Sequence, residues 1–237
     1  MTDARPDAPS ATTSADPNQV VRYALWAVYG RSGAQPDDSA GLADELREWK
    51  RVLSGEDVVV RGVYDVSGLR PDADLMLWLH GPSAESLQAA LRKFRRTRAG
   101  ATLTLTWSAM ATHRRAEFSA DHLPSFMLGT QARQWLCVYP FVRSYDWYLL
   151  PEEERREMLS EHGIAGRAHA GVQANTLAAF ALNDWEWILA LESDDLHELV
   201  DLMRGLRATE ARRHVRLEIP FHTGHLVDLD EALEVIR

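Results

Sequence analysis

One stretch of the sequence concentrates residues that can be oxidised. Tyr139, Tyr145, Trp147 and Tyr148 place four aromatic rings within ten residues, and Arg143 lies among them. A tyrosine can lose an electron and a proton together, and an arginine can bind a carboxylate through two parallel hydrogen bonds. These residue types suit the oxidation of an anionic molecule. Aromatic residues at strand ends serve packing more often than redox chemistry, so both interpretations stay open.

A histidine follows these aromatic residues at the end of a predicted helix. Residues 151–162 begin with a proline and three acidic residues, as helix N-termini do, and Gly163 is expected to cap the C-terminus. His162 could ligate haem iron through a neutral imidazole. A histidine at a helix C-terminus more often stabilises the helix dipole. His169, seven residues later, is the main rival ligand.

Composition limits the class of protein. The 237 residues carry a net charge of -9, which argues against a general nucleic-acid binder but leaves room for a local basic pocket. No apolar run approaches the roughly 20 residues that span a bilayer, and no signal-peptide pattern is present. The single cysteine, Cys137, has no partner for an internal disulfide and is interpreted as a small buried residue. We therefore expect a cytoplasmic protein that binds neither nucleic acid nor membrane.

Hydrophobic periodicity predicts the same order of elements twice. In the first half, strands are expected at 20–29, 58–64, 75–80 and 102–107, with helices at 42–53 and directly after residue 83. In the second half, strands are expected at 135–142, within 172–182, at 185–191 and at 215–219, with helices at 151–162 and 196–206. The two halves also share a short sequence pattern, which begins at Asp74-Leu75 in the first half and at Asp184-Trp185 in the second, at an offset of about 110 residues.

This repeat predicts an α+β fold in which two duplicated ferredoxin-like β-α-β-β-α-β modules form an α+β barrel. We expect a disordered N-terminal tail at 1–18, a first module at 19–110, a linker at 111–134 and a second module at 135–237. A pocket is expected between the sheet and the helices. The linker is long for a connection, which is typical of a functional segment.

Four blocks of the second half resemble the coproheme decarboxylases, which belong to the chlorite-dismutase-like family, and most closely the actinobacterial branch. The blocks are Tyr139-Pro140-Phe141, Asp146-Trp147-Tyr148-Leu149-Leu150, Glu161-His162-Gly163-Ile164-Ala165-Gly166-Arg167 and Asp184-Trp185-Glu186-Trp187. The resemblance extends over nearly everything after the tail.

The resemblance implies a reaction and a set of roles. Members of the family bind iron coproporphyrin III (coproheme) and use hydrogen peroxide to decarboxylate two propionates, which gives haem b. His162 then corresponds to the proximal iron ligand, Tyr139 to the catalytic tyrosine that forms a radical, and His122 to the distal base that deprotonates peroxide. Arg143 and Trp147 match positions on the propionate side of the pocket.

Further expectations concern binding and partners. Coproheme carries four propionates, and Arg212 is a second candidate, beside Arg143, to bind them. The resemblance also implies a homopentamer. The chemistry of the substrate implies a ferrochelatase upstream, with which a transient contact is expected. His222 and His225 lie close together without a cysteine or third ligand nearby, so no zinc site is expected there.

Two other functions compete with decarboxylation. One is a haem peroxidase or chlorite-degrading enzyme of the same superfamily, although no arginine is found where chlorite dismutases use one on the distal side. The other is a non-enzymatic haem-binding protein. In the decarboxylase hypothesis, coproheme is both the substrate and the redox cofactor, and haem b is the product.

Overall fold

The two halves of the chain fold with the same order of elements in the computed structural model, which describes residues 20–34, 36–113 and 123–237. The tail predicted at 1–18 and His122 lie outside these ranges. The first half comprises β1 (Arg22–Arg31), α1 (Ser39–Gly55), β2 (Val59–Asp65), β3 (Leu75–Gly81), α2 (Ala84–Phe94) and β4 (Leu103–His113). The second half comprises β5 (Trp135–Arg143), α3 (Glu152–Arg167), β6 (Gln173–Ala178), β7 (Trp187–Ser193), α4 (Leu196–Leu206) and β8 (Val215–Leu217).

Two further elements complete the chain, β9 (His222–Val227) and α5 (Leu229–Val235), and the sequence analysis did not predict either of them. In the described ranges the strands form one nine-stranded antiparallel sheet in the order β7-β6-β4-β1-β3-β2-β9-β5-β8. An additional pairing of β7 with β5 closes this sheet on itself. The predicted α+β barrel of duplicated ferredoxin-like modules is therefore confirmed.

Strand β9 joins the two halves. Its C-terminal end pairs with β2, so that Tyr64 lies opposite Leu226, and its N-terminal end pairs with β5, so that Leu136 lies opposite Gly224. On the other side of the barrel, β4 meets β6 where Thr112 faces Ala178. The two modules consequently share backbone hydrogen bonds along two seams.

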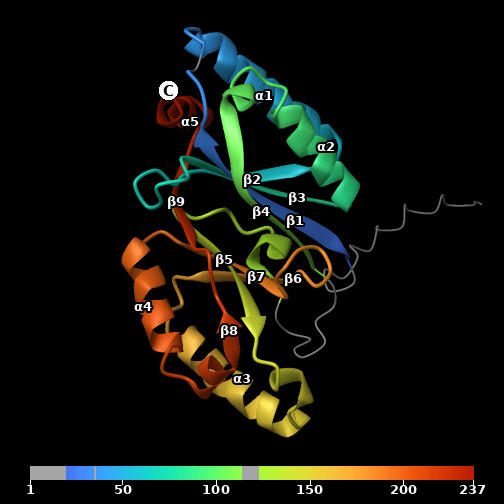
Figure 1. The fold of residues 1–237 in the computed structure, drawn as a ribbon, viewed down its shortest axis with the longest axis vertical. Coiled ribbons are helices and arrows are strands. Elements are labelled where there is room, and N and C mark those ends of the chain that lie inside the picture. The colour runs from blue at the N-terminus through green and yellow to red at the C-terminus, as the bar shows by residue number, and fades with distance from the viewer. Residues whose placement is uncertain (1–19, 35, 114–122) are drawn as a thin grey trace, which may run out of the picture.

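The helices cover the outside of the barrel at its two ends (Figure 1). α1, α2 and α5 pack on the first half, where Trp49 and Phe94 lie with ring centroids 5.3 Å apart. α3 and α4 lie on the second half. α2 begins at the predicted cap, since the Ser83 side chain accepts a hydrogen bond from the Ser86 amide. No helix within the described ranges is long and apolar enough to cross a membrane.

The barrel interior is mostly apolar and combines small residues with a few large rings. The rings of Trp26 and Trp78 are in contact, with their centroids 5.3 Å apart, and small residues such as Ala109 and Ala190 lie in the same cluster. Cys137, on the opposite face of β5, is buried as predicted, and burial raises the pKa of its thiol to about 11. It therefore behaves as a small packed residue and carries no thiolate at neutral pH.

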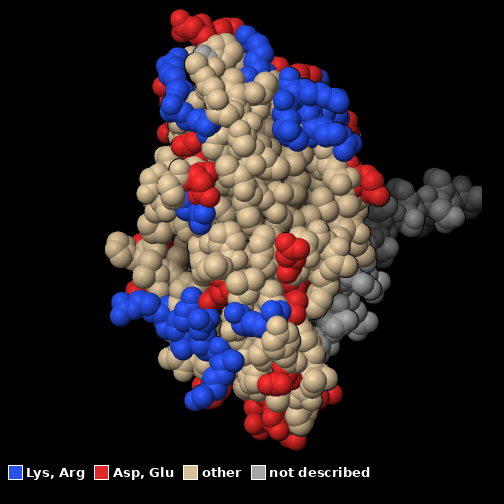
Figure 2. All heavy atoms as spheres, in the orientation of Figure 1, with Lys and Arg blue, Asp and Glu red and all other residues tan. Residues whose placement is uncertain are grey.

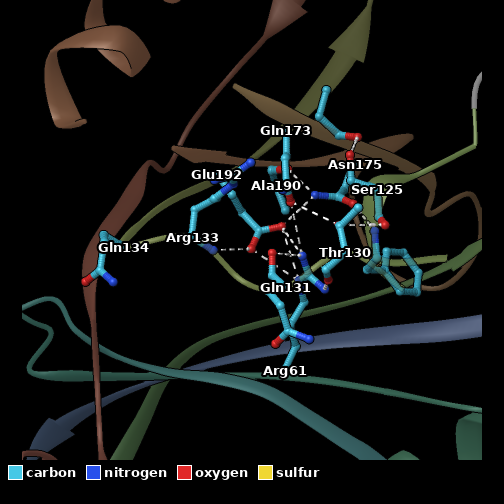
Figure 3. A network of polar contacts seen from close by, with 12 residues as sticks. Arg61, Ser125, Thr130, Gln131, Arg133, Gln134, Gln173, Asn175, Ala190 and Glu192 are labelled. Carbon is cyan, nitrogen blue, oxygen red and sulfur yellow. Dashed lines mark hydrogen bonds and ion pairs between the residues drawn. The ribbon is translucent and has the colours of Figure 1, made fainter. Parts of the chain in front are cut away.

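One polar network crosses the barrel between strands that are not neighbours (Figure 3). Arg61 of β2 donates to Glu192 of β7 at 2.8 Å, and Asn175 of β6 donates to the same carboxylate at 3.0 Å. The side chains of Arg61 and Glu192 are only 6% and 0% exposed. Arg61 also donates to the carbonyl of Thr130, and the Phe126 amide donates to Asn175. The network thus ties the segment before β5 to both halves.

Candidate active site

Alternation along β5 sends one set of side chains to the helix side of the sheet. Leu136 and Val138 point into the barrel, whereas Cys137 and Tyr139 contact the side chains of α4. Because the period of a strand is two residues, Arg143 falls on the same face as Tyr139. The strand therefore presents its chemically useful residues to the space beneath α3 and α4.

A cavity of about 60 Å³ lies in this space. Four of the residues predicted from the sequence line it together: Tyr139, Arg143, His162 and Arg212. They come from β5, from α3 and from the 3₁₀ turn Glu210–His214, and they are as much as 73 positions apart in the chain, counting from 139 to 212. The fold thus gathers an oxidisable phenol, an imidazole and two guanidinium groups around one volume.

Trp147 lines a second cavity of about 170 Å³, which shares Phe141 and Arg143 with the first. The Arg143 guanidinium carbon lies 4.1 Å from the centroid of the Trp147 ring and 4.9 Å from that of Phe141. Burial lowers the pKa of Arg143, but an arginine stays protonated at any physiological pH. Arg143 is therefore a half-buried cation held between two rings at the junction of the two cavities.

Tyr139 is almost fully buried. Its ring stacks on Phe221 with centroids 4.5 Å apart, and its hydroxyl contacts the Met203 sulfur at 3.5 Å. Burial raises the pKa of this phenol well above its ordinary value. Tyr139 therefore keeps its proton at neutral pH, and an oxidant that removes its electron must let the proton leave as well.

His162 lies within α3 and not at the end of a helix. The prediction that Gly163 caps the helix is wrong, because α3 continues to Arg167 and an added Cβ at Gly163 would meet only the tip of that arginine side chain. The dipole interpretation of His162 therefore fails. Its Nδ1 lies 3.4 Å from the Thr209 hydroxyl, and the described residues make no hydrogen bond to Nε2. Burial lowers the pKa of His162, and Arg143 adds to this effect, so the ring is neutral and able to ligate a metal.

The rival ligand does not share this position. His169 faces Gly205 of α4, where its Nε2 would lie 3.5 Å from an added Cβ, and it lines neither of the two cavities. His222, which the sequence analysis considered for zinc, lies in β9 against Trp107, with ring centroids 4.7 Å apart. His122 lies outside the described residues, so its assigned role stays a prediction.

The helix that carries His162 lies on the surface of the second half and is partly exposed. None of the residues of α3 is fully buried, and Ile164 is 61% exposed. Each of the two cavities is smaller than the roughly 300–1,000 Å³ of a typical small-molecule pocket. A flat ligand therefore fits between α3 and the sheet only if α3 or the dividing side chains of Phe141 and Arg143 move. Such a movement would expose no side chain of α3 that is now fully buried.

The sequence analysis missed residues that complete the cavity. Arg207 and Glu218 line it beside Arg212, and Met203 and Leu206 of α4 form its apolar wall. Arg207 and Arg212 both pair with the carboxylate of Glu218. No local motif connects these residues, because the contact depends on the turn between α4 and β8. Leu206 and Met203 follow the predicted apolar face of α4, which was the only available signal.

Comparisons with known proteins agree with this architecture. The chlorite dismutase family matches residues 40–227 of the chain. A coproheme decarboxylase from Mycolicibacterium smegmatis is 50% identical over 218 residues, which are 91% of this chain and 94% of that protein. A solved structure of chlorite dismutase from Candidatus Nitrospira defluvii in complex with imidazole superposes with a TM-score of 0.80 at 23% identity, covering 91% of this chain and 94% of the other. This last similarity concerns the fold alone.

Proposed function

Because the chain is an enzyme of the chlorite dismutase family, we propose that it converts coproheme to haem b by peroxide-dependent oxidative decarboxylation of two propionates. The observation that carries the proposal is the cavity that Tyr139, Arg143, His162 and Arg212 line together. The curated relative at 50% identity supports it, since that protein is a coproheme decarboxylase. A simple porphyrin binder needs a histidine and an apolar pocket, but not a buried tyrosine beside two arginines.

The donor set fits an iron porphyrin with carboxylate substituents. Bound iron supplies peroxide activation, which a neutral histidine ligand favours. His162 offers Nε2 for ligation, while the contact of Nδ1 with Thr209 orients the ring. Arg143 of β5 and Arg212 of the turn Glu210–His214 offer guanidinium groups for propionates in the cavity. The same arginines restrict which propionates approach Tyr139.

Tyr139 oxidises the substrate by hydrogen-atom transfer. Its hydroxyl gives up a hydrogen atom and the resulting radical takes one from the β-carbon of a propionate. Loss of a second electron releases carbon dioxide and leaves a vinyl group. Each propionate thus consumes one peroxide, which is reduced to two waters. We retain His122 as the residue that takes the proton of peroxide, a role that rests on the sequence resemblance.

The direct test mixes the purified protein with iron coproporphyrin III, adds peroxide stepwise and follows the porphyrin by mass spectrometry. The proposal expects two successive losses, each of carbon dioxide and two hydrogen atoms, with about one peroxide consumed per loss. Porphyrin of unchanged mass, or bleaching alone, would reject decarboxylation and leave a haem-binding protein or a peroxidase.

Chlorite degradation is the second candidate, because the matched family is named for it. An oxygen electrode separates the two activities, since only chlorite degradation releases sustained oxygen from chlorite. We further propose that the chain forms a homo-oligomer, with a homopentamer expected, and that it receives coproheme from a ferrochelatase. Light scattering on the purified protein measures the number of subunits.

A further inference from the structure

Three charged side chains separate the inner cavity from the surface. The Glu218 carboxylate pairs with Arg207 at 2.6 Å and with Arg212 at 2.5 Å. All three line the inner cavity that contains Tyr139 and His162, and all three also line a hollow of about 320 Å³ outside it. The ion pairs therefore stand at the boundary between the two volumes.

This boundary lies in a strongly basic region of an acidic chain. Five arginines fall between residues 204 and 216, although the whole chain carries a net charge of -9. Figure 2 shows Lys and Arg side chains gathered over the region where Figure 1 places α4 and β8. Arg213 pairs with Glu210, and Arg216 lies 4.4 Å from the centroid of the Tyr145 ring. Glu218 is the carboxylate that pairs with two of the three arginines that line the inner cavity, Arg207 and Arg212.

The exposures of the three side chains favour exchange of this carboxylate for another. Arg207 and Arg212 are each 39% exposed, whereas Glu218 is 14% exposed. The exposed parts of the two guanidinium groups let a second carboxylate approach them from solvent and compete with Glu218. An arginine fork binds any carboxylate in the same geometry. The propionates of coproheme are chemically equivalent to the side chain that they would displace.

We propose that Glu218 competes with the substrate's propionates for Arg207 and Arg212 at the boundary of the inner cavity. Without substrate, Glu218 pairs with both arginines. When the substrate binds, its propionates replace the Glu218 carboxylate on these arginines. The inference rests on the proposed function, because it takes the substrate to be a porphyrin with four carboxylates. The exchange weakens binding most for the ligand with the most carboxylates. Glu218 thereby moderates the affinity for the tetra-acid substrate more than that for haem b, which keeps only two propionates.

The test measures binding without peroxide, so that it is independent of turnover. Iron coproporphyrin III and its tetramethyl ester, which has no free carboxylates, are titrated against the wild type, Glu218→Gln and Glu210→Gln, with the Soret band as readout. Glu218→Gln is expected to bind the tetra-acid about tenfold more tightly and the ester as the wild type does. Glu210→Gln removes the same charge from an exposed pair nearby and is expected to change neither affinity.

A double variant tests whether the gain in affinity depends on the arginine that Glu218 releases. Arg207→Gln combined with Glu218→Gln is expected to lose most of the gain, because a freed guanidinium is then missing. Unchanged or weaker binding of the tetra-acid by Glu218→Gln would overturn the inference, and so would an equal gain for the ester. Thermal unfolding checks that each variant is folded. If the peroxide assay fails while the binding pattern is as expected, only the proposed reaction falls.

Discussion

Among the described residues, the Tyr139 hydroxyl makes one hydrogen-bond contact, to the Met203 sulfur at 3.5 Å, so its chemical role can be separated from its structural one. Tyr139→Phe keeps the ring that stacks on Phe221 and removes only this weak contact. We expect the free energy of unfolding to change by less than about 1 kcal/mol, whereas decarboxylation is lost. Denaturant unfolding and porphyrin mass measure the two effects. Normal turnover by the variant would exclude Tyr139 as the radical site.

Ligation can be assigned by comparing two histidines that lie seven residues apart. His162 lines the cavity and its Nε2 accepts no hydrogen bond from the described residues, whereas His169 faces Gly205 of α4. We expect His162→Ala to weaken binding of iron coproporphyrin III and to change its Soret position. His169→Ala serves as the control and is expected to leave both unchanged. The opposite pattern in an absorption titration would make His169 the ligand.

His222 should make the protein sensitive to acid. Its ring is 2% exposed, neither nitrogen has a hydrogen-bond partner among the described residues, and burial lowers its pKa to about 4. An unfolded chain binds the proton at about pH 6.5. Above about pH 6.5, His222 is neutral in both the folded and the unfolded protein and does not lower the free energy of unfolding. As the pH drops from about 6.5 to about 4, the unfolded chain binds the proton more readily than the folded one, so the free energy of unfolding falls.

The expected loss at pH 4.5 is about 2 kcal/mol relative to pH 7. Urea unfolding at the two pH values measures it, and His222→Leu is expected to reduce the difference by that amount. The control, His197→Gln, removes a histidine whose side chain is 92% exposed and should leave the difference unchanged. An equal pH dependence in wild type and His222→Leu would contradict the argument.

At the scale of elements, regular periodicity identified most of the fold. The apolar faces of α2 and α4 and the alternation at the start of β4 are local signals, and they agree with the observed elements. β9 was missed because its residues are mostly half-buried and its partners, β2 and β5, lie far away in the chain. α3 was ended too early because Gly163 resembles a helix stop, although space around it allows the helix to continue.

The same reasoning explains which part of the site could be predicted. Tyr139, Arg143 and Trp147 are close in sequence, so spacing alone brings them together. Arg207 and Glu218 meet through the turn between α4 and β8, which no periodic pattern encodes. Sequence analysis therefore located the residues on β5 and α3 and left the opposite wall of the cavity incomplete.

The exposure of α3 leads to a prediction about ligand binding. Because none of its residues is fully buried, we expect its amides to exchange hydrogen faster than those of α1, which buries five residues. Iron coproporphyrin III at about 100 times its Kd should stabilise the folded state by about 2.7 kcal/mol and slow exchange in α3 by up to about 100-fold. Hydrogen-exchange mass spectrometry follows both helices. Equal protection of α3 and α1 in the ligand-free protein would contradict this account.

At the scale of the molecule, two kinds of contact hold the modules together. Backbone pairing runs along the seams of β9 with its two partners and of β4 with β6. The Arg61–Glu192 pair adds a polar link through the barrel interior. Burial raises the pKa of Glu192, and the guanidinium of Arg61 opposes that shift, so the carboxylate depends on its partner to stay ionised. Each member of the pair would be costly to bury alone.

Breaking this link should therefore destabilise the whole barrel. Glu192→Gln leaves the Arg61 cation buried without a counter-ion and is expected to lower the free energy of unfolding by about 3–5 kcal/mol. Arg61→Gln should cost a similar amount, but the double variant should cost less than the sum because neither charge remains. Glu234→Gln, which breaks an exposed pair with Arg237, should change stability by less than about 1 kcal/mol. Denaturant unfolding of the four variants measures the coupling, and additive losses would show that the pair does not act as one unit.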